Sequence, residues 1–325
     1  MAFFKKPPAA WVGNKNVARF KTANGVRVAN PSWRPFVDIP SKKNNDQSVA
    51  ANKCYSPSDS STVACYLSLS TFFEYLIEQG EIDRNPVKMV RQKTKYVSSV
   101  DNLAPIRRLS NFQWDYVIET VRDLAEKNPE EHERSLFIMS ALYCMYLRIS
   151  ELVSDERSSP VMSDFYKDLD GNWWFRTVGK GKKARDIVVS EEMLAALKRY
   201  RLHLGLSPYP MVHKDSHPLL TNHRDGGPIT STGHVRRIVQ LCFDAALQKM
   251  QDDGLGADDT YQLKSATVHW IRHTAISEDV KIRPREHVKA DAGHESWNTT
   301  ERYINSDNRE RHSSGANKPI TGQTS

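Results

Sequence analysis

A chain of 325 residues with 39% apolar residues is long enough to form about two domains, each with a core of its own. No apolar run approaches the roughly 20 residues that cross a bilayer, and the N-terminus lacks the apolar segment of a secretion signal, so we expect a soluble, cytoplasmic protein without membrane partners. The four cysteines are scattered, without a Cys-x-x-Cys pair, which indicates reduced thiols and neither a disulfide framework nor a zinc site.

The net charge of +7 is concentrated in the first third of the chain. Residues 1–106 hold 15 Lys and Arg against 8 Asp and Glu, and the remainder holds 31 of each sign. A basic module joined to a neutral one suggests that one part holds a polyanion and the other has a second task. The alternative is a surface whose charge serves only solubility.

The first third contains few regular elements. Residues 1–46 have no sustained periodicity and predict an N-terminal arm or irregular extension. Apolar residues then recur at helical spacing from about 60 to 79, and the Asn85-Pro86 turn can start another helix, so we expect a helical domain over 47–103. The basic residues of 91–108 predict a linker before a second domain over 104–325.

The second domain reads as mainly helical with one small β-hairpin, an α+β fold. Ser110 and Gln113 predict a capping box at the start of a helix, and a second helix, about 131–147, is expected to end at Arg148. Strand-like residues at 173–178 and 187–189 flank a lysine-rich turn. Further helices are expected at about 191–204, 231–250, 265–280 and 284–292, followed by a polar tail after Asp307.

Residue types suited to phosphate chemistry recur in the second domain. The candidates, in chain order, are Arg148, Lys180, His269, Arg272, His294 and Tyr303. Exchange of a phosphodiester without a metal needs a nucleophile, cations for the charge that builds on the non-bridging oxygens, and a proton for the departing 5′ oxygen. Tyrosine, arginine pairs and lysine or histidine suit these three tasks in turn.

Four extended segments resemble the sequence boxes of the tyrosine recombinase (phage integrase) family. They are LRISEL at 147–152, GKGKKAR at 179–185, HWIRHTA at 269–275, and the ending GH at 293–294 with TTERY at 299–303. The resemblance covers about residues 107–306, and 60–90 also look like the family's helical core-binding domain. The family often has glycine two residues before its first arginine, where this chain has Tyr146, a change of packing and not of charge.

The resemblance implies a role for each matched residue. Tyr303 would be the nucleophile that forms a 3′-phosphotyrosyl bond, and Arg148 with Arg272 would clamp the scissile phosphate. Lys180 would protonate the 5′ oxygen, although Lys182 and Lys183 lie within one turn of it. His269 would act as general acid and base, and His294 would donate a hydrogen bond to the phosphate. Glu151 matches the family's supporting acid, on the same face as Arg148 if the helix continues.

The implied architecture is a helical core-binding domain joined to a tyrosine-recombinase catalytic domain, the two forming a clamp around double-stranded DNA. Four protomers would act on two recombination sites through a Holliday junction, with a C-terminal tail that docks on a neighbouring protomer. No cofactor is needed, because each phosphotyrosyl ester conserves the energy of the broken bond, and no metal site is expected. The candidate DNA-contacting residues are Arg91, Lys93, Lys95, Arg107, Arg108, Lys182 and Arg236.

Two alternative functions remain at this point, a type IB topoisomerase that relaxes DNA by the same chemistry and a DNA-binding protein that has lost catalysis. Taken alone, each candidate has a plainer interpretation, such as a salt-bridged arginine or a half-buried tyrosine. His269 and His273 are spaced for a metal, but the glutamate of a metalloprotease motif is missing. The target sequence, the direction of recombination, the mobile element and the role of the acidic segment 247–265 are not encoded in any motif.

Overall fold

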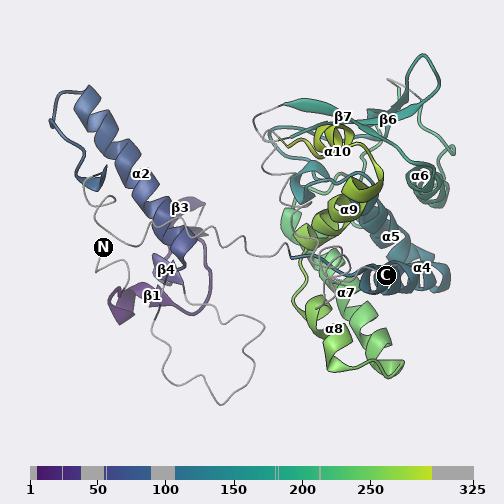
Figure 1. The fold of residues 1–325 in the computed structure, drawn as a ribbon, viewed down its shortest axis with the longest axis horizontal. Coiled ribbons are helices and arrows are strands. Elements are labelled where there is room, and N and C mark those ends of the chain that lie inside the picture. The colour runs from purple at the N-terminus through teal and green to yellow at the C-terminus, as the bar shows by residue number, and fades with distance from the viewer. Residues whose placement is uncertain are drawn as a thin grey trace, which may run out of the picture. The chain divides into compact units, whose positions relative to one another are not determined.

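The computed structural model describes residues 6–23, 25–37, 55, 57–88, 107–179, 181, 183–211 and 214–294 (Figure 1). The chain divides into two compact units, Met1–Asn102 and Leu103–Ser325. Within the described ranges, none of the helices combines the length and apolar character that crossing a membrane requires.

The first unit opens with short strands where the sequence predicted an extended or irregular segment. After a 3-10 turn, Ala9–Trp11, strand β1 (Val12–Gly13) pairs in parallel with β4 (Phe36–Val37). Strands β2 (Phe20–Ala23) and β3 (Val26–Ala29) form an antiparallel hairpin. Because these strands have two to four residues and mostly exposed side chains, they carry no alternation that would identify them from sequence.

The long helix of the first unit is α2 (Asp59–Glu78), close to the predicted span. The Ser58 side chain caps it by accepting from the backbone N–H of Ser61 at 3.1 Å. The predicted Asn85-Pro86 turn folds back onto this helix, because the Asn85 amide donates to the Glu74 carboxylate at 2.6 Å and to the Ser70 carbonyl at 3.1 Å.

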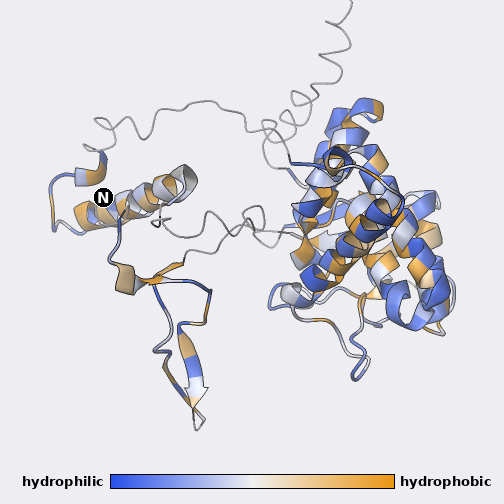
Figure 2. Cartoon of the chain, turned by 90° about the horizontal axis from the view of Figure 1, so that it is seen from below, coloured by the Kyte–Doolittle hydropathy of each residue, from blue (hydrophilic) through white to orange (hydrophobic). Residues whose placement is uncertain are grey.

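The core of the second unit is built on α4 (Asn111–Lys127), α5 (Pro129–Cys144) and α7 (Thr232–Asp252). The predicted capping box is confirmed, since Ser110 and Gln113 exchange hydrogen bonds of 3.1 Å. Buried apolar residues of all three helices form one cluster, and the helices of this unit carry both hydrophobic and hydrophilic residues along their lengths (Figure 2).

A three-stranded antiparallel sheet packs on this core. The predicted hairpin is present as β6 (Trp173–Val178) and β7 (Ala184–Val188), and β5 (Phe165–Lys167), too short for sequence to reveal, adds a third strand. Phe165, Phe175 and Ile187 lie in register across the three strands and are fully buried. The sheet therefore has one apolar face, which fixes the register of the hairpin.

The remaining helices are α6 (Glu191–His203), α8 (Ala257–Lys264), α9 (Val268–Ile282) and α10 (Arg285–Ala292). The acidic segment 247–265 is the end of α7 together with α8, which had not been predicted. Polar contacts tie the end of α7 to α4, because the Tyr116 hydroxyl donates to Asp253 at 3.1 Å and Lys249 pairs with Asp123 at 2.8 Å. This segment thus has a structural role.

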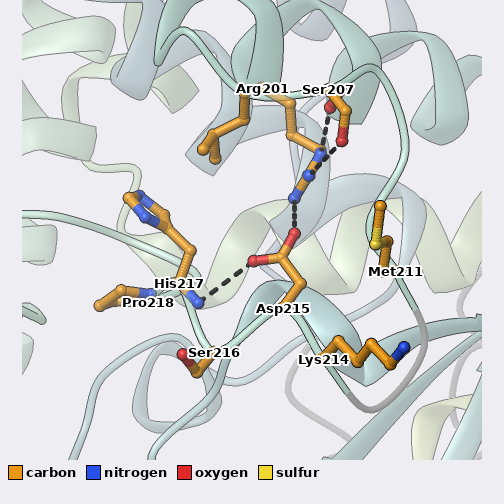
Figure 3. Close-up of a pocket in the computed structure, with 9 residues that line it drawn as sticks. Arg201, Ser207, Met211, Lys214, Asp215, Ser216, His217 and Pro218 are labelled. Atoms are coloured by element: carbon orange, nitrogen blue, oxygen red, sulfur yellow. Dashed lines mark hydrogen bonds and ion pairs between the residues drawn. The ribbon is translucent and has the colours of Figure 1, made fainter.

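A pocket of about 550 Å³ lies beside the loop that follows α6 (Figure 3). Its wall contains the fully buried Arg201, which pairs with Asp215 at 2.7 Å and donates to the Ser207 carbonyl at 2.8 Å. Asp215 also accepts from the backbone N–H of His217 at 3.2 Å. These bonds hold the loop against α6, and the sequence-predicted site residues are absent from the lining.

Shortening a buried side chain of the second unit's core should lower the free energy of unfolding. Leu142 on α5 is completely buried, so Leu142→Ala should lower the free energy of unfolding by about 2–5 kcal/mol, because it leaves a cavity. Leu241 on α7 is 63% exposed, and Leu241→Ala should change that free energy by less than about 0.5 kcal/mol. Urea unfolding measures both, and equal effects would contradict the assignment of this core.

Candidate active site

The first arginine lies beyond the end of a helix, which corrects the prediction that α5 runs to Arg148. The helix ends at Cys144, and Tyr146 adopts a left-handed conformation with φ of +48°. That is the position after a helix C-cap where glycine is the usual residue, because side chains other than glycine cost about 1–2 kcal/mol there. The family's usual glycine at this position therefore has a backbone explanation, and the chain bears this strain.

A 3-10 turn, Ile149–Glu151, brings the Glu151 carboxylate back to Arg148. The two residues therefore meet although the helix that the sequence prediction had assumed does not continue through them. The carboxylate of Glu151 accepts from the Arg148 backbone N–H at 2.8 Å and from Arg148 Nη1 at 3.1 Å. Only 2% of the Glu151 side chain is exposed. Burial alone would raise the pKa of Glu151, but hydrogen bonds and charges from Arg185 and Arg148 hold it below its ordinary value.

Arg185 is a site residue that the sequence predictions missed. From β7 its Nη1 and Nη2 donate to the two oxygens of Glu151 at 2.8 and 2.9 Å. Gly179 leaves room for this contact, because a Cβ there would lie 3.1 Å from Arg185 Nη1 and 3.3 Å from Glu151 Oε1. The signal was strand alternation, since Arg185 lies two residues before the buried Ile187 and so shares the inward face of β7 with it.

Three arginines meet three successive carbonyls at the C-terminal end of α10. Arg185 Nε donates to Asp291 at 2.9 Å, Arg148 Nη2 donates to Gly293 at 3.3 Å, and the buried Arg272 donates to Ala292. The other amino group of Arg272 donates to the Tyr146 carbonyl. The last carbonyls of a helix lack partners within it and carry its negative partial charge, which makes this end a receptor for guanidinium groups.

The Tyr146 side chain belongs to a second network under the same helix end. Its hydroxyl donates to Asp279 and accepts from Arg283 Nη1 at 2.8 Å. Arg283 Nη2 donates to Asp291 at 2.6 Å. Burial raises the pKa of Asp291, and Arg283 offsets part of that rise. The network joins the segment after α5 to α9, which carries Arg272, and to α10, which precedes His294.

Two predicted histidines lie close enough to the arginines for the positive charges to affect their pKa values. His294 is half-buried, whereas His269 is exposed. Partial desolvation by the surrounding protein and then the charges of Arg272 and Arg148 lower the pKa of His269 below its ordinary value. The same causes lower the pKa of His294 to about 3. Both imidazoles are therefore neutral at pH 7 in the DNA-free protein. His273 makes an edge contact with His269, with ring centroids 4.7 Å apart.

The structure thus brings together Arg148, Glu151, His269, Arg272 and His294. Among the DNA-contact candidates, Arg107 and Arg236 are exposed, and Arg108 pairs with Glu278 at 2.9 Å. Six predicted residues lie outside the described residues, namely Arg91, Lys93, Lys95, Lys180, Lys182 and Tyr303. In the sequence, Lys180 stands between Gly179 and Gly181, after the end of β6 and before the start of β7.

The arrangement concentrates fixed positive charge beside neutral proton carriers. Each guanidinium is held by carbonyls or by Glu151 before a ligand arrives, so an anionic group gains electrostatic stabilisation without reorganising the protein. A phosphate with two non-bridging oxygens fits this donor set. Within the described ranges, no group of three or more His, Cys, Asp and Glu side chains is placed to hold a metal ion.

The depressed pKa of His294 predicts how stability depends on pH. The unfolded imidazole binds a proton near pH 6.5, whereas the folded one binds it only near pH 3. The unfolded state therefore holds more protons between these values, and the free energy of unfolding should fall as pH drops below about 6.5. His294→Gln should lose part of this fall, while His287→Gln, at an exposed position of α10, should keep it. Urea unfolding at pH 7.5 and 5.0 compares them, and identical pH dependence in all three proteins would contradict the prediction.

No protein-family model matches the chain. Three curated proteins similar to it are all named tyrosine recombinase XerC. A tyrosine recombinase XerC of Thermodesulfovibrio yellowstonii is 29% identical over 261 residues, which cover 76% of this chain and 71% of the relative. A XerC of Staphylococcus haemolyticus is 24% identical over 248 residues, 75% of this chain and 69% of the relative. The match to a XerC of Chlorobaculum parvum, 26% identical, spans only 39% of that relative's length.

Solved structures share the fold. Lambda integrase bound to DNA superposes with a TM-score of 0.50 at 17% identity, covering 81% of this chain and 79% of that chain. A lambda integrase dimer bound to a COC′ core site gives the same score and identity over 82% of this chain and 63% of that chain. The chain is therefore similar in sequence to tyrosine recombinases and shares the fold of lambda integrase.

Proposed function

We propose that the protein is a site-specific DNA recombinase that breaks and rejoins strands through a 3′-phosphotyrosyl bond to Tyr303. The observation that supports this function best is the set of fixed arginines, Arg148 and Arg272, beside two neutral histidines. The matched relatives are recombinases by name, and neither relaxation of DNA by a topoisomerase nor loss of catalysis has support in the comparisons.

In the proposed reaction, Arg148 and Arg272 bind the non-bridging oxygens of the scissile phosphate. The Tyr303 oxygen attacks phosphorus as its proton passes to His269, which is neutral and so able to accept it. Lys180 gives a proton to the departing 5′ oxygen, and His294 donates a hydrogen bond to the phosphate. Attack by a 5′ hydroxyl of the partner strand reverses these transfers, so the exchange needs no ATP and no cofactor.

The assembly that this function requires is also a proposal. Residues 47–103 would form the core-binding domain, and residues 104–325 the catalytic domain with its tail. Four protomers would join two double-stranded DNA sites and pass through a Holliday junction, in the cytoplasm of the host of a mobile element.

Replacing the nucleophile should separate chemistry from binding. Tyr303→Phe should abolish covalent attachment to suicide substrates that carry candidate recombination sites, because phenylalanine has no attacking oxygen. Affinity in a gel-shift assay should stay within about twofold. Tyr261→Phe, at a 57% exposed position on α8, is the matched control and should attach normally. Attachment by the Tyr303 variant on a denaturing gel would refute the assignment of this nucleophile.

The basic character of the first unit supports a contact with the DNA backbone. Residues 6–37 contain six Lys and Arg and no Asp or Glu. Arg19, Lys21 and Arg27 are exposed around the β2–β3 hairpin, and the guanidinium of Arg27 lies 4.4 Å from the centre of the Phe20 ring. These three cations are placed on a narrow element that a phosphate backbone can approach.

Salt dependence tests this contact. Replacing Arg19, Lys21 and Arg27 together by Ala should reduce the slope of log affinity against log salt by about 2 to 3, because each lost phosphate contact releases one counterion fewer. Replacing the exposed Lys127, Lys198 and Lys264 makes the same change of charge in the second unit and should leave the slope nearly unchanged. Equal slopes for wild type and the hairpin variant would exclude the contact.

A further inference from the structure

We infer that Arg185 is a positioning residue of this active site, which orients Arg148 through Glu151 and fixes the end of α10 that carries His294. The inference rests on the proposed recombinase chemistry. Arg185 is more deeply buried than Arg148, because 12% of the Arg185 side chain is exposed and 31% of the Arg148 side chain is exposed. Arg148 therefore has more of its surface available to a ligand, whereas all three guanidinium nitrogens of Arg185 donate to protein acceptors.

The first link runs through the buried carboxylate. Glu151 Oε1 accepts from Arg185 at 2.8 Å and from Arg148 at 3.1 Å, so one oxygen joins the two guanidinium groups. Its Oε2 accepts from Arg185 at 2.9 Å and from the Arg148 backbone at 2.8 Å. Without Arg185, the carboxylate would lose two of its four hydrogen bonds and could rotate, and Arg148 would lose a fixed partner.

The second link runs to α10, which lies against β7 (Figure 1). Arg185 Nε donates to the Asp291 carbonyl at 2.9 Å, three residues before His294. The approach is close, because a Cβ on Gly293 would lie 3.0 Å from Arg185 Cδ. Arg185 is thus inserted between the β-hairpin, the Glu151 turn and the chain that leads to His294.

The geometry requires arginine. Three nitrogens of one guanidinium serve three acceptors, two on a carboxylate and one on a carbonyl at the side of the planar group. Lysine keeps the charge but has one nitrogen and cannot span these acceptors in one plane. A lysine variant therefore separates the loss of charge from the loss of orientation.

The test uses single-turnover covalent attachment to a suicide substrate. Arg185→Gln should slow attachment about 100-fold, as misplaced catalytic groups typically do, while DNA affinity changes less than about threefold. Arg185→Lys should recover part of the rate. Arg176→Gln is the matched control, because Arg176 on the same hairpin also makes two hydrogen bonds to a carboxylate, Asp186, but lies exposed, and its rate should match wild type.

Coupling shows whether Arg185 acts through Glu151. Removing both partners, in Glu151→Gln with Arg185→Gln, should slow attachment no more than the worse single change, because the two residues form one unit. The double variant also avoids an unpaired buried charge, so it provides folded protein if Arg185→Gln alone does not fold. A wild-type rate of attachment in Arg185→Gln, or in the double variant, would overturn the inference. It would also be overturned if the rate loss of the double variant equalled the product of the two single rate losses, because the residues would then act independently.

A readout independent of the reaction separates this inference from the proposed function. The charge of Arg185 is among those that lower the pKa of His294, so Arg185→Gln should raise that pKa from about 3 in an NMR titration of the DNA-free protein, and Arg176→Gln should not. If wild type forms no covalent complex, the proposed function fails while the titration still tests the placement of Arg185. An unchanged His294 titration in Arg185→Gln would count against that placement.

Discussion

The site depends on one constraint, which is how three guanidinium groups can share a small volume. Arg148, Arg185 and Arg272 repel one another, and Glu151 supplies a single compensating charge. The C-terminal carbonyls of α10 supply the rest, because they point away from the helix with partial negative charge. The remaining excess of positive charge suits an anionic ligand, and together with burial it lowers the pKa values of His269 and His294.

The fold meets this constraint by bringing distant segments to α10. The stop of α5 at a left-handed Tyr146 aims its carbonyl at Arg272 and turns the chain toward Arg148. The hydroxyl of the same tyrosine joins the network of Asp279 and Arg283, so the side chain that strains the backbone also secures the helices around the site. The sheet contributes through its register, because burial of Ile187 places Arg185 on the inward face.

Much of the fold was predictable because its signals are local. The capping box at Ser110, the β6–β7 hairpin and the helices of the second unit follow from residues close together in the chain. Strand β5, with three residues, and helix α8, with eight, are too short for a clear period. The predicted end of α5 was wrong because its apolar pattern continues through Leu147, although the backbone has already left the helix at Tyr146.

By itself, the sequence determined the residue types and their order, and these sufficed to indicate the resemblance to tyrosine recombinases, because phosphodiester chemistry restricts which side chains serve. Tertiary structure decided the contacts that hold them. Arg185 looked like one more basic residue of the hairpin, and its role emerged only when β7, the Glu151 turn and α10 met. The low pKa of His294 likewise arises from burial and from arginines up to 146 positions away in the chain, and a sequence pattern does not encode such distances.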